Sequence, residues 1–250
     1  MNTIRKISEI LPEVNIVPCQ AEESPQTSQL KIIKVHGTVN CQKPSSNNEI
    51  IIKHANSLIE NYQINKPLFT NLKRYFLGMD GEFNPKKGLF LFGGVGAGKT
   101  SIMKIFRLWL NEIQAKSKYN IFSIRQIERE YKIDGFKALD YYTYKTYINA
   151  YGIKEHRPEN ICLDDIGTES LAIKNYGDQI NVFTELIQDR YDLFIDKNII
   201  THATTNIAPK KFKEIYSDER VESRLREMFN IVTMVDKNEK GETIDYRRHL

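Results

Sequence analysis

Apolar residues recur along this chain in two alternating rhythms, and their order predicts a layered fold. Short runs that contain apolar residues and have the length of strands occupy residues 89–92, 119–122, 160–163, 199–205 and 229–235, and the first of them is apolar throughout. Apolar residues return every third or fourth position, as on one face of a helix, over residues 51–62, 67–77 and 101–116 and again between the later runs. Because strands and helices alternate, we predict an α/β fold in which a five-stranded parallel sheet carries helices on both faces.

Polar residues predict where several helices begin. Ser123 and Gln126 have the spacing of a capping box, in which two side chains reciprocally bond the first helical N–H groups. We expect Asp178 to open a long helix and Ser217 to cap one that ends at residue 228. Residues 134–158 follow neither rhythm and are expected to be irregular.

Residues 1–48 differ in composition from the rest of the chain. Half of the eight prolines fall there, among polar, turn-rich stretches. We predict a loosely ordered arm with one short strand at 30–35, and we interpret the arm as a partner-binding segment. Residues 49–250 form the second predicted unit, one α/β domain whose leading helices lie within 49–80.

Composition favours a folded, water-soluble protein. Hydrophobic residues make up 40% and charged residues 27% of the 250, and the formal net charge of +4 permits contact with nucleic acid without arguing for it. The three cysteines are far apart, which fits a reducing cytoplasm. No run of about 18 apolar residues occurs and the first residues lack a signal-peptide core, so we expect no membrane span and a cytoplasmic location.

A glycine-rich loop follows the first apolar run. Gly93 to Thr100 reads Gly-Gly-Val-Gly-Ala-Gly-Lys-Thr, which matches the phosphate-binding pattern G-x-x-x-x-G-K-[ST] in full. Glycines let backbone N–H groups turn toward phosphate oxygens, and the next helix presents its N-terminus to the same anion. The predicted binding residues are Gly93, Gly94, Val95, Gly96, Ala97, Gly98, Lys99, Thr100 and Ser101.

The two ends of this loop predict the ligand. Lys99 is expected to reach the β- and γ-phosphates of a nucleotide, and the Thr100 hydroxyl is expected to bind Mg²⁺. The chain has no Asn-Lys-x-Asp motif for reading guanine after the loop. We therefore predict ATP and Mg²⁺ as the cofactors.

Polar residues end two later strands, at the edge where parallel sheets bind ligands. After the run 160–163, Asp164 is expected to hold Mg²⁺ and Asp165 to polarise the attacking water, although such a pair also caps turns. Asn206 follows the run 199–205 and would lie beside the γ-phosphate. Taken alone, Asn206 is more simply a turn residue before Pro209.

Two further segments have both a structural and a functional interpretation. Arg220, Arg224 and Arg226 share one predicted helix and form either surface ion pairs or a trans-acting group for ATP on a neighbouring subunit. Tyrosines alternate with lysines over the segment Tyr131–Tyr151, which suits either a packing surface or the stacking of single-stranded DNA bases.

The order of these motifs resembles a known class of proteins. The glycine loop is followed by Leu-Asp-Asp-Ile-Gly, Ala-Thr-Thr-Asn, Glu-Arg-Val-Glu-Ser-Arg-Leu-Arg and Asp-Tyr-Arg-Arg. Over residues 66–250 this resembles the AAA+ ATPases of the bacterial helicase-loader type (DnaC/DnaI-like) and their IstB-like transposition relatives. The resemblance implies ATP hydrolysis in DNA replication, self-assembly, and a replicative helicase or a transposase as partner.

The resemblance also implies roles for individual residues. Asn206 matches the sensor I position, Arg224 the trans-acting arginine finger with Arg220 as the next choice, and Arg247 the sensor II arginine. The helical lid that follows in other AAA+ proteins is expected to be reduced or absent. Asp165 stands where many AAA+ proteins have Glu, and Gly94 where Pro is frequent, so the rate of hydrolysis stays open.

Two other functions fit the same phosphate loop. One is a nucleotide-switched adaptor with negligible turnover, which uses ATP to order a partner-binding surface. The other is a small-molecule kinase, which needs an arginine-rich lid that we do not find after Asp165. Residues 1–48 resemble no family that we can name, so the resemblance does not identify the partner.

Overall fold

The computed structural model describes residues 46–59, 65–144, 146–148, 150–175 and 178–234. Most of the arm predicted at 1–48, its short strand at 30–35, the segment where a lid is expected to be reduced or absent, and Arg247 lie outside the described residues. Within the described ranges, no helix combines the length and apolar character needed to cross a bilayer.

One five-stranded sheet organises the domain, and its strands are all parallel. From edge to edge the order is β2 (Asn120–Ser123), β5 (Ile161–Ile166), β8 (Thr201–Thr205), β1 (Gly88–Gly93) and β9 (Phe229–Met234). The five strands are those that the apolar runs predict, so the predicted fold class is confirmed. Strand β8 lies between β1 and β5, which brings the ends of these three strands together.

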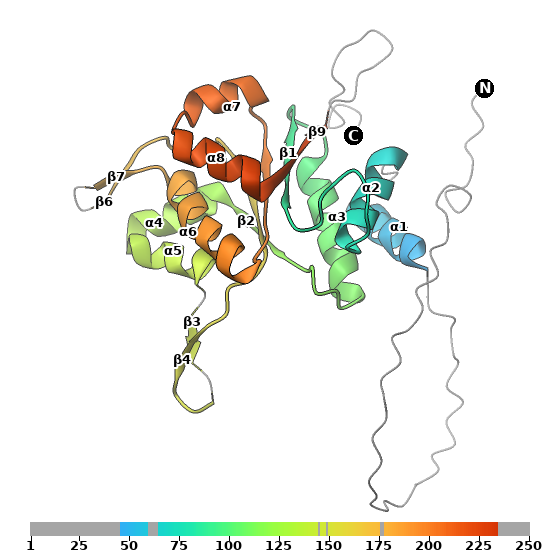
Figure 1. Cartoon of the computed structure of the whole chain (residues 1–250), viewed down its shortest axis with the longest axis horizontal. Coiled ribbons are helices and arrows are strands. Elements are labelled where there is room, and N and C mark those ends of the chain that lie inside the picture. The colour runs from blue at the N-terminus through green and yellow to red at the C-terminus, as the bar shows by residue number, and fades with distance from the viewer. Residues whose placement is uncertain (1–45, 60–64, 145, 149, 176–177, 235–250) are drawn as a thin grey trace, which may run out of the picture.

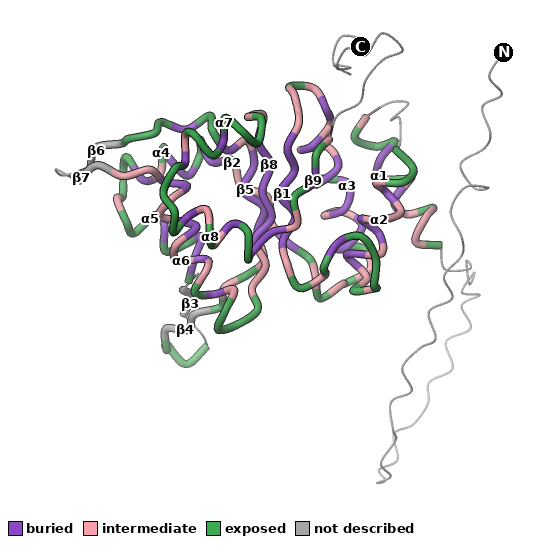
Figure 2. Tube along the Cα trace, turned by 45° about the horizontal axis from the view of Figure 1, so that its top comes forward, coloured by how far each residue is buried: buried purple, intermediate pink, exposed green. Residues whose placement is uncertain are grey.

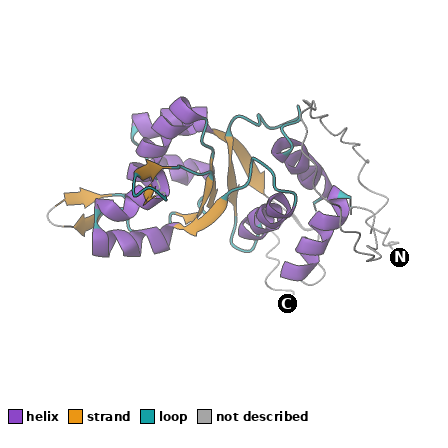
Figure 3. Ribbon diagram, turned by 90° about the horizontal axis from the view of Figure 1, so that it is seen from below, coloured by secondary structure: helices purple, strands orange, loops and turns teal. Residues whose placement is uncertain are grey.

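Helices cover both faces of the sheet (Figures 1 and 3). One face carries α1 (Asn47–Leu58), α2 (Lys66–Phe76) and α3 (Lys99–Glu112). The other carries α4 (Ile124–Asp134), α5 (Phe136–Thr143), α6 (Val182–Lys197), α7 (Pro209–Ile215) and α8 (Glu219–Met228). Side chains of a strand alternate between faces, so Leu89 and Leu91 join the first core while Phe90 and Phe92 join the second. Figure 2 shows the buried trace running through the sheet.

Two antiparallel hairpins project from the second face, and both correct the sequence-based expectation. Strands β3 (Thr146–Ile148) and β4 (Lys154–His156) pair within the stretch expected to be irregular, which also contains α5. Strands β6 (Ile173–Asn175) and β7 (Asp178–Ile180) form the other hairpin. Asp178 therefore belongs to a strand, and α6 begins after Asn181, whose side chain accepts a hydrogen bond from the Thr184 N–H at 2.9 Å.

Helix capping also differs from the sequence pattern. Ser123 occupies the N-cap of α4 but makes no side-chain cap bond, and the Gln126 amide instead donates to Glu130 Oε1 at 3.0 Å. Helix α8 is capped by Asp218 rather than by Ser217. A capping side chain competes with other nearby partners, so spacing alone does not decide which bond forms.

A buried arginine ties the second face to the sheet. Arg190 is fully buried, and its guanidinium donates to Thr201 Oγ1 at 2.5 Å and to the carbonyl oxygens of Tyr142 at 2.6 Å and Glu159 at 2.9 Å. Burial lowers the pKa of Arg190 to about 9. These bonds join α5, α6 and the starts of β5 and β8.

Arg190→Met is expected to lower the free energy of unfolding by about 3 kcal/mol, because it leaves several buried acceptors without a donor. Urea unfolding followed by circular dichroism measures this loss. Arg129→Met, at an exposed site on α4, is the matched control and should change stability little. An equally stable Arg190→Met protein would show that the buried bonds contribute little.

Candidate phosphate-binding site

The glycine loop joins β1 to α3 and has the backbone of an anion cradle. Gly96 and Gly98 have φ angles of 83° and 80°, a left-handed conformation that side chains disfavour. The first intrahelical bond of α3 runs from the Ile102 N–H to the Gly98 carbonyl at 2.9 Å. The N–H groups of a first helical turn have no intrahelical acceptor, so they can bind phosphate oxygens.

Lys99 links this loop to the end of β8. Its side chain is buried, and its ammonium donates to the carbonyl oxygens of Gly93 and Gly94, both at 2.8 Å. The same ammonium donates to Asn206 Oδ1 at 2.6 Å. The structure therefore brings together Lys99 and Asn206, which are 107 residues apart in the chain.

Thr100 and Asp164 lie side by side. The Thr100 hydroxyl donates to Asp164 Oδ1 at 2.9 Å, and the Thr204 hydroxyl donates to the same oxygen at 2.6 Å. Burial raises the pKa of the Asp164 carboxyl, while these two hydrogen bonds lower it. A hydroxyl and a carboxylate at this separation are the oxygen donors that Mg²⁺ prefers, so the residues fit the expected cation.

Thr204 was not among the predicted site residues. It also accepts a hydrogen bond from the Asp165 N–H at 3.0 Å, so one hydroxyl orients both aspartates. The available signal was a polar residue inside a buried central strand, two positions before Asn206.

Asp165 has an unusual backbone, and the strand around it is irregular. Strand β5 continues to Ile166, with a shift of its pairing to β8 between Leu163 and Ile166. Asp165 has a φ of 61°, and its Oδ1 accepts a hydrogen bond from the Asn206 amide at 3.3 Å. Shifted pairing of this kind re-aims a side chain at the rim of a sheet.

Lys99, Asn206 and Asp165 thus form a continuous hydrogen-bonded row, beside the pair formed by Thr100 and Asp164. Three parallel strands end at this row, and the glycine loop closes one side of it. This is a P-loop fold.

A cavity adjoins the start of the P-loop. It encloses about 250 Å³ between the first turns of α2 and the edge strand β9. Asn65, Leu68 and Phe83 contribute to its wall, together with Met234, which is the strand partner of Gly93. The cavity therefore lies beside the point where the P-loop leaves the sheet.

Comparisons with known proteins return structures and no sequence relatives. No family model and no curated protein matches the chain. The crystal structure of DnaI is 20% identical over 80% of this chain and 87% of its own, with a TM-score of 0.42. The crystal structure of the DnaC helicase loader is 18% identical over 74% of this chain and 98% of its own, with a TM-score of 0.45. The names are those of the class that the motif order resembles.

The arginines of α8 lie on a helix that packs beside α6. The Arg224 guanidinium lies over the Tyr191 ring at 5.1 Å, and its Nη1 is buried without a hydrogen-bond partner among the described residues. Arg226 forms an ion pair with Glu222, and Arg220 is exposed. Arg247 lies outside the described residues, so its predicted role stays a prediction.

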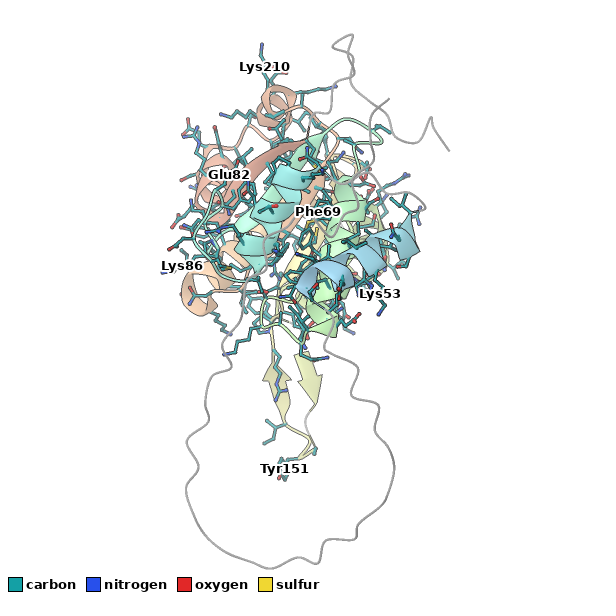
Figure 4. All side chains as sticks on the ribbon, turned by 90° about the vertical axis from the view of Figure 1, so that its right-hand side faces the viewer. Lys53, Phe69, Glu82, Lys86, Tyr151 and Lys210 are labelled. Atoms are coloured by element: carbon teal, nitrogen blue, oxygen red, sulfur yellow. The ribbon has the colours of Figure 1, made fainter. Side chains whose placement is uncertain are left out.

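The tyrosine-rich segment divides into buried and exposed parts. Tyr131 and Tyr142 lie in the core, and the Tyr142 hydroxyl donates to Glu130, as the packing interpretation expects. Tyr144 is partly exposed, and burial together with the charges of nearby aspartates raises its pKa. Tyr151 is 88% exposed and stands at the tip of the β3–β4 hairpin (Figure 4).

Proposed function

We propose that the protein binds ATP with Mg²⁺, hydrolyses it, and acts in DNA replication as a helicase-loader-like factor. The observation that carries the proposal is the row formed by Lys99, Asn206 and Asp165 beside Thr100 and Asp164. These residues come from the P-loop and from the ends of two neighbouring strands, which is the set that Mg²⁺–nucleotide chemistry requires. The motif order supports the role in replication.

Each residue has one task in this proposal. The Lys99 ammonium exchanges its loop carbonyls and Asn206 for the β- and γ-phosphates, and the loop N–H groups bind the same oxygens. Thr100 and Asp164 hold Mg²⁺, which neutralises charge on the phosphates. Asp165 and Asn206, already joined by a hydrogen bond, orient the attacking water.

We assign the cavity between α2 and β9 to the nucleobase. Its volume of about 250 Å³ accommodates a purine ring, and its lining combines the apolar Leu68, Phe83 and Met234 with the polar Asn65 and Asn71. Pockets of this mixed character bind flat ligands and orient them through a few polar groups. The cavity adjoins Gly93 through Met234, so base and phosphates can be held at once.

Single-turnover and steady-state phosphate release, with and without single-stranded DNA, test the proposal. Steady-state turnover that exceeds one phosphate per protomer supports an ATPase. A single phosphate with no further turnover supports the nucleotide-switched adaptor, and phosphate transfer to a small acceptor supports the kinase.

The proposed partner is a replicative helicase, bound through residues 1–48 and the adjoining helix α1. A transposase is the alternative that the motif order leaves open. Co-purification with each purified partner, in the presence and absence of ATP, separates the two. Binding to the transposase alone would overturn the replication role and leave the ATPase proposal intact.

We further propose that copies of the chain assemble and that Arg224 acts on ATP bound by a neighbour. Two observations support this role: the buried Nη1 of Arg224 has no hydrogen-bond partner among the described residues, and the Tyr191 ring packs against its guanidinium. Arg224→Ala is then expected to leave ATP affinity within twofold and to lower turnover by about 1000-fold in the assembled state alone. Turnover per protomer, measured across protein concentrations, checks this.

Arg226→Ala is the matched control, since Arg226 lies on the same helix in an ion pair with Glu222 and should be nearly silent. Arg220→Ala tests the next choice. Wild-type turnover per protomer that does not change with concentration would contradict a trans-acting arginine on either residue.

Single-stranded DNA is proposed to contact the tip of the β3–β4 hairpin. Tyr151 offers an exposed ring there, next to the exposed Ile153. Because a stacked base is worth about 1–3 kcal/mol, Tyr151→Ala should weaken binding of an oligothymidine by about fivefold or more. Fluorescence anisotropy measures this, and Tyr141→Ala, at an exposed tyrosine of α5, is the control. Equal affinity of all three proteins would rule out stacking at the tip.

A further inference from the structure

The turn that follows Asp165 is held in shape by its own hydrogen bonds. The Thr168 hydroxyl and N–H both donate to the Asp165 carbonyl, at 2.8 and 3.2 Å. Gly167 has a φ of 91°, where a side chain would be strained. Asp165 and Gly167 are thus both left-handed, and the direction of the Asp165 side chain depends on the turn that ends at Glu169.

Glu169 connects this turn to α7. The side chain is 94% buried, given its exposed fraction of 6%, and both carboxylate oxygens are used. Oε2 accepts a hydrogen bond from the Gly167 N–H at 2.6 Å, and Oε1 accepts one from the Tyr216 hydroxyl at 2.5 Å. One carboxylate therefore bonds the turn beside the predicted catalytic acid and the end of a helix 47 residues later.

Tyr216 in turn fixes the start of α8. Tyr216 is the C-cap residue of α7, and its ring packs on Phe212 and Phe183 with centroid distances of 4.5 and 5.0 Å. Two residues later, Asp218 caps α8 by accepting from the Arg220 N–H at 2.8 Å. The chain between Tyr216 and α8 is too short to let either move independently of the other.

The same turn also contacts the residue after Asn206. A Cβ added at Gly167 would lie 2.1 Å from Ile207 Cδ1, so Ile207 packs directly on the Gly167 backbone. The Thr205 hydroxyl donates to the Ile166 carbonyl at 2.7 Å and accepts from the Ile207 N–H at 3.1 Å. A displacement of this turn would therefore move Asp165 and Asn206 together.

We infer that Glu169 is a positioning residue that couples the orientation of Asp165 and Asn206 to the position of α8 through its hydrogen bond with Tyr216. The inference rests on the proposed function, in which α8 meets a neighbouring protomer. When a neighbouring protomer contacts α8, the contact would then set the relative orientation of Asp165 and Asn206 in the protomer to which that α8 belongs. Assembly would raise turnover through this bond, in addition to any arginine supplied in trans.

The chemistry of the bond suits a coupling element. A buried carboxylate that loses one of its donors is left with an unmet desolvation cost, so the arrangement favours one geometry over its neighbours. Both partners are desolvated, and burial raises the pKa of Glu169 and of Tyr216.

Tyr216→Phe tests the inference, because it removes the hydroxyl and keeps the packed ring. Tyr142→Phe is a matched control: its hydroxyl also donates to a glutamate of a neighbouring helix, Glu130, away from the site. For each full-length protein, turnover per protomer is measured from dilute to assembled concentrations, with ATP affinity and the concentration of assembly measured alongside. Glu169→Gln is the second variant, used also if Tyr216→Phe does not fold.

We expect assembly to stimulate wild-type turnover, and Tyr216→Phe to reduce that stimulation by about tenfold. ATP affinity and the concentration of assembly should stay within twofold, and Tyr142→Phe should match the wild type. Unchanged stimulation in Tyr216→Phe and Glu169→Gln, or an equal loss in Tyr142→Phe, would overturn the coupling alone. A wild-type protein without turnover would overturn the proposed function, and the coupling with it.

Discussion

Lys99→Ala is expected to reduce ATP turnover by at least about 100-fold and to weaken ATP binding. The ammonium is the positive charge that the loop itself carries, and in this structure it donates hydrogen bonds to two loop carbonyls and to Asn206 Oδ1. Alanine leaves the phosphates without a side-chain cation from the loop, and it also removes the hydrogen bond to Asn206. Steady-state phosphate release and titration calorimetry with ATP measure the two losses.

Lys116→Ala serves as the control for this change, since Lys116 is exposed beyond the end of α3. It should bind and hydrolyse ATP like the wild type. A Lys99→Ala protein with full turnover would contradict the proposed ATPase, whatever its affinity for nucleotide.

Asp165→Asn should separate binding from hydrolysis. Asn tolerates the left-handed backbone that Asp165 adopts, so the turn should keep its shape, and the amide oxygen can still accept from Asn206. The carboxylate charge that polarises water is lost, so turnover should fall by about 100-fold or more while ATP affinity changes little. Single-turnover hydrolysis and calorimetry report the two quantities separately.

Asp196→Asn, at an exposed position near the end of α6, is the matched control and should be silent. Turnover retained in Asp165→Asn would assign the polarising group elsewhere in the site. Asp165→Glu adds a separate comparison, because Glu is the residue that many AAA+ proteins carry at this position. Glu is less tolerant of a positive φ, so the longer carboxylate is expected to perturb the turn.

The sheet could be predicted because its three central strands, β1, β5 and β8, are buried on both faces. Strand β1 is a continuous apolar run. Helical segments separate each of the five strands from the next, which implies parallel pairing. The site followed from the same reasoning. Lys99 ends the loop that follows β1, Asp164 lies near the end of β5, and Asn206 directly follows β8. The carboxyl ends of parallel strands meet at one edge.

The hairpins could not be predicted in the same way. Strands β3, β4, β6 and β7 have three residues each and lie outside the main sheet, so no core imposes an apolar rhythm on them. Asp178 was predicted to start a helix because a short polar residue just before an apolar helical segment favours the N-cap position. In the structure Asn181, three positions later, is the N-cap of α6.

The contacts that orient the site also lay beyond the sequence pattern. Thr204 reaches both aspartates because the pairing of β5 and β8 shifts beside it, and register is a property of two strands together. The hydrogen bond between Glu169 and Tyr216 joins the turn after β5 to the end of α7. These two segments are close only because of how α7 packs in the folded domain. Spacing along one chain does not encode either contact.

The central place of β8 has a consequence for folding. Strand β1, which leads into the glycine loop, pairs with β8 and β9, both more than 100 residues later in the chain. The loop is therefore synthesised long before the strands that flank β1 in the sheet. Pairings of such sequence separation form slowly. During translation the phosphate site should stay incomplete until Asn206 has left the ribosome, and early fragments should expose the apolar flanks of β1. The protein is therefore expected to acquire nucleotide affinity late and in one step, as the last strands add to the sheet.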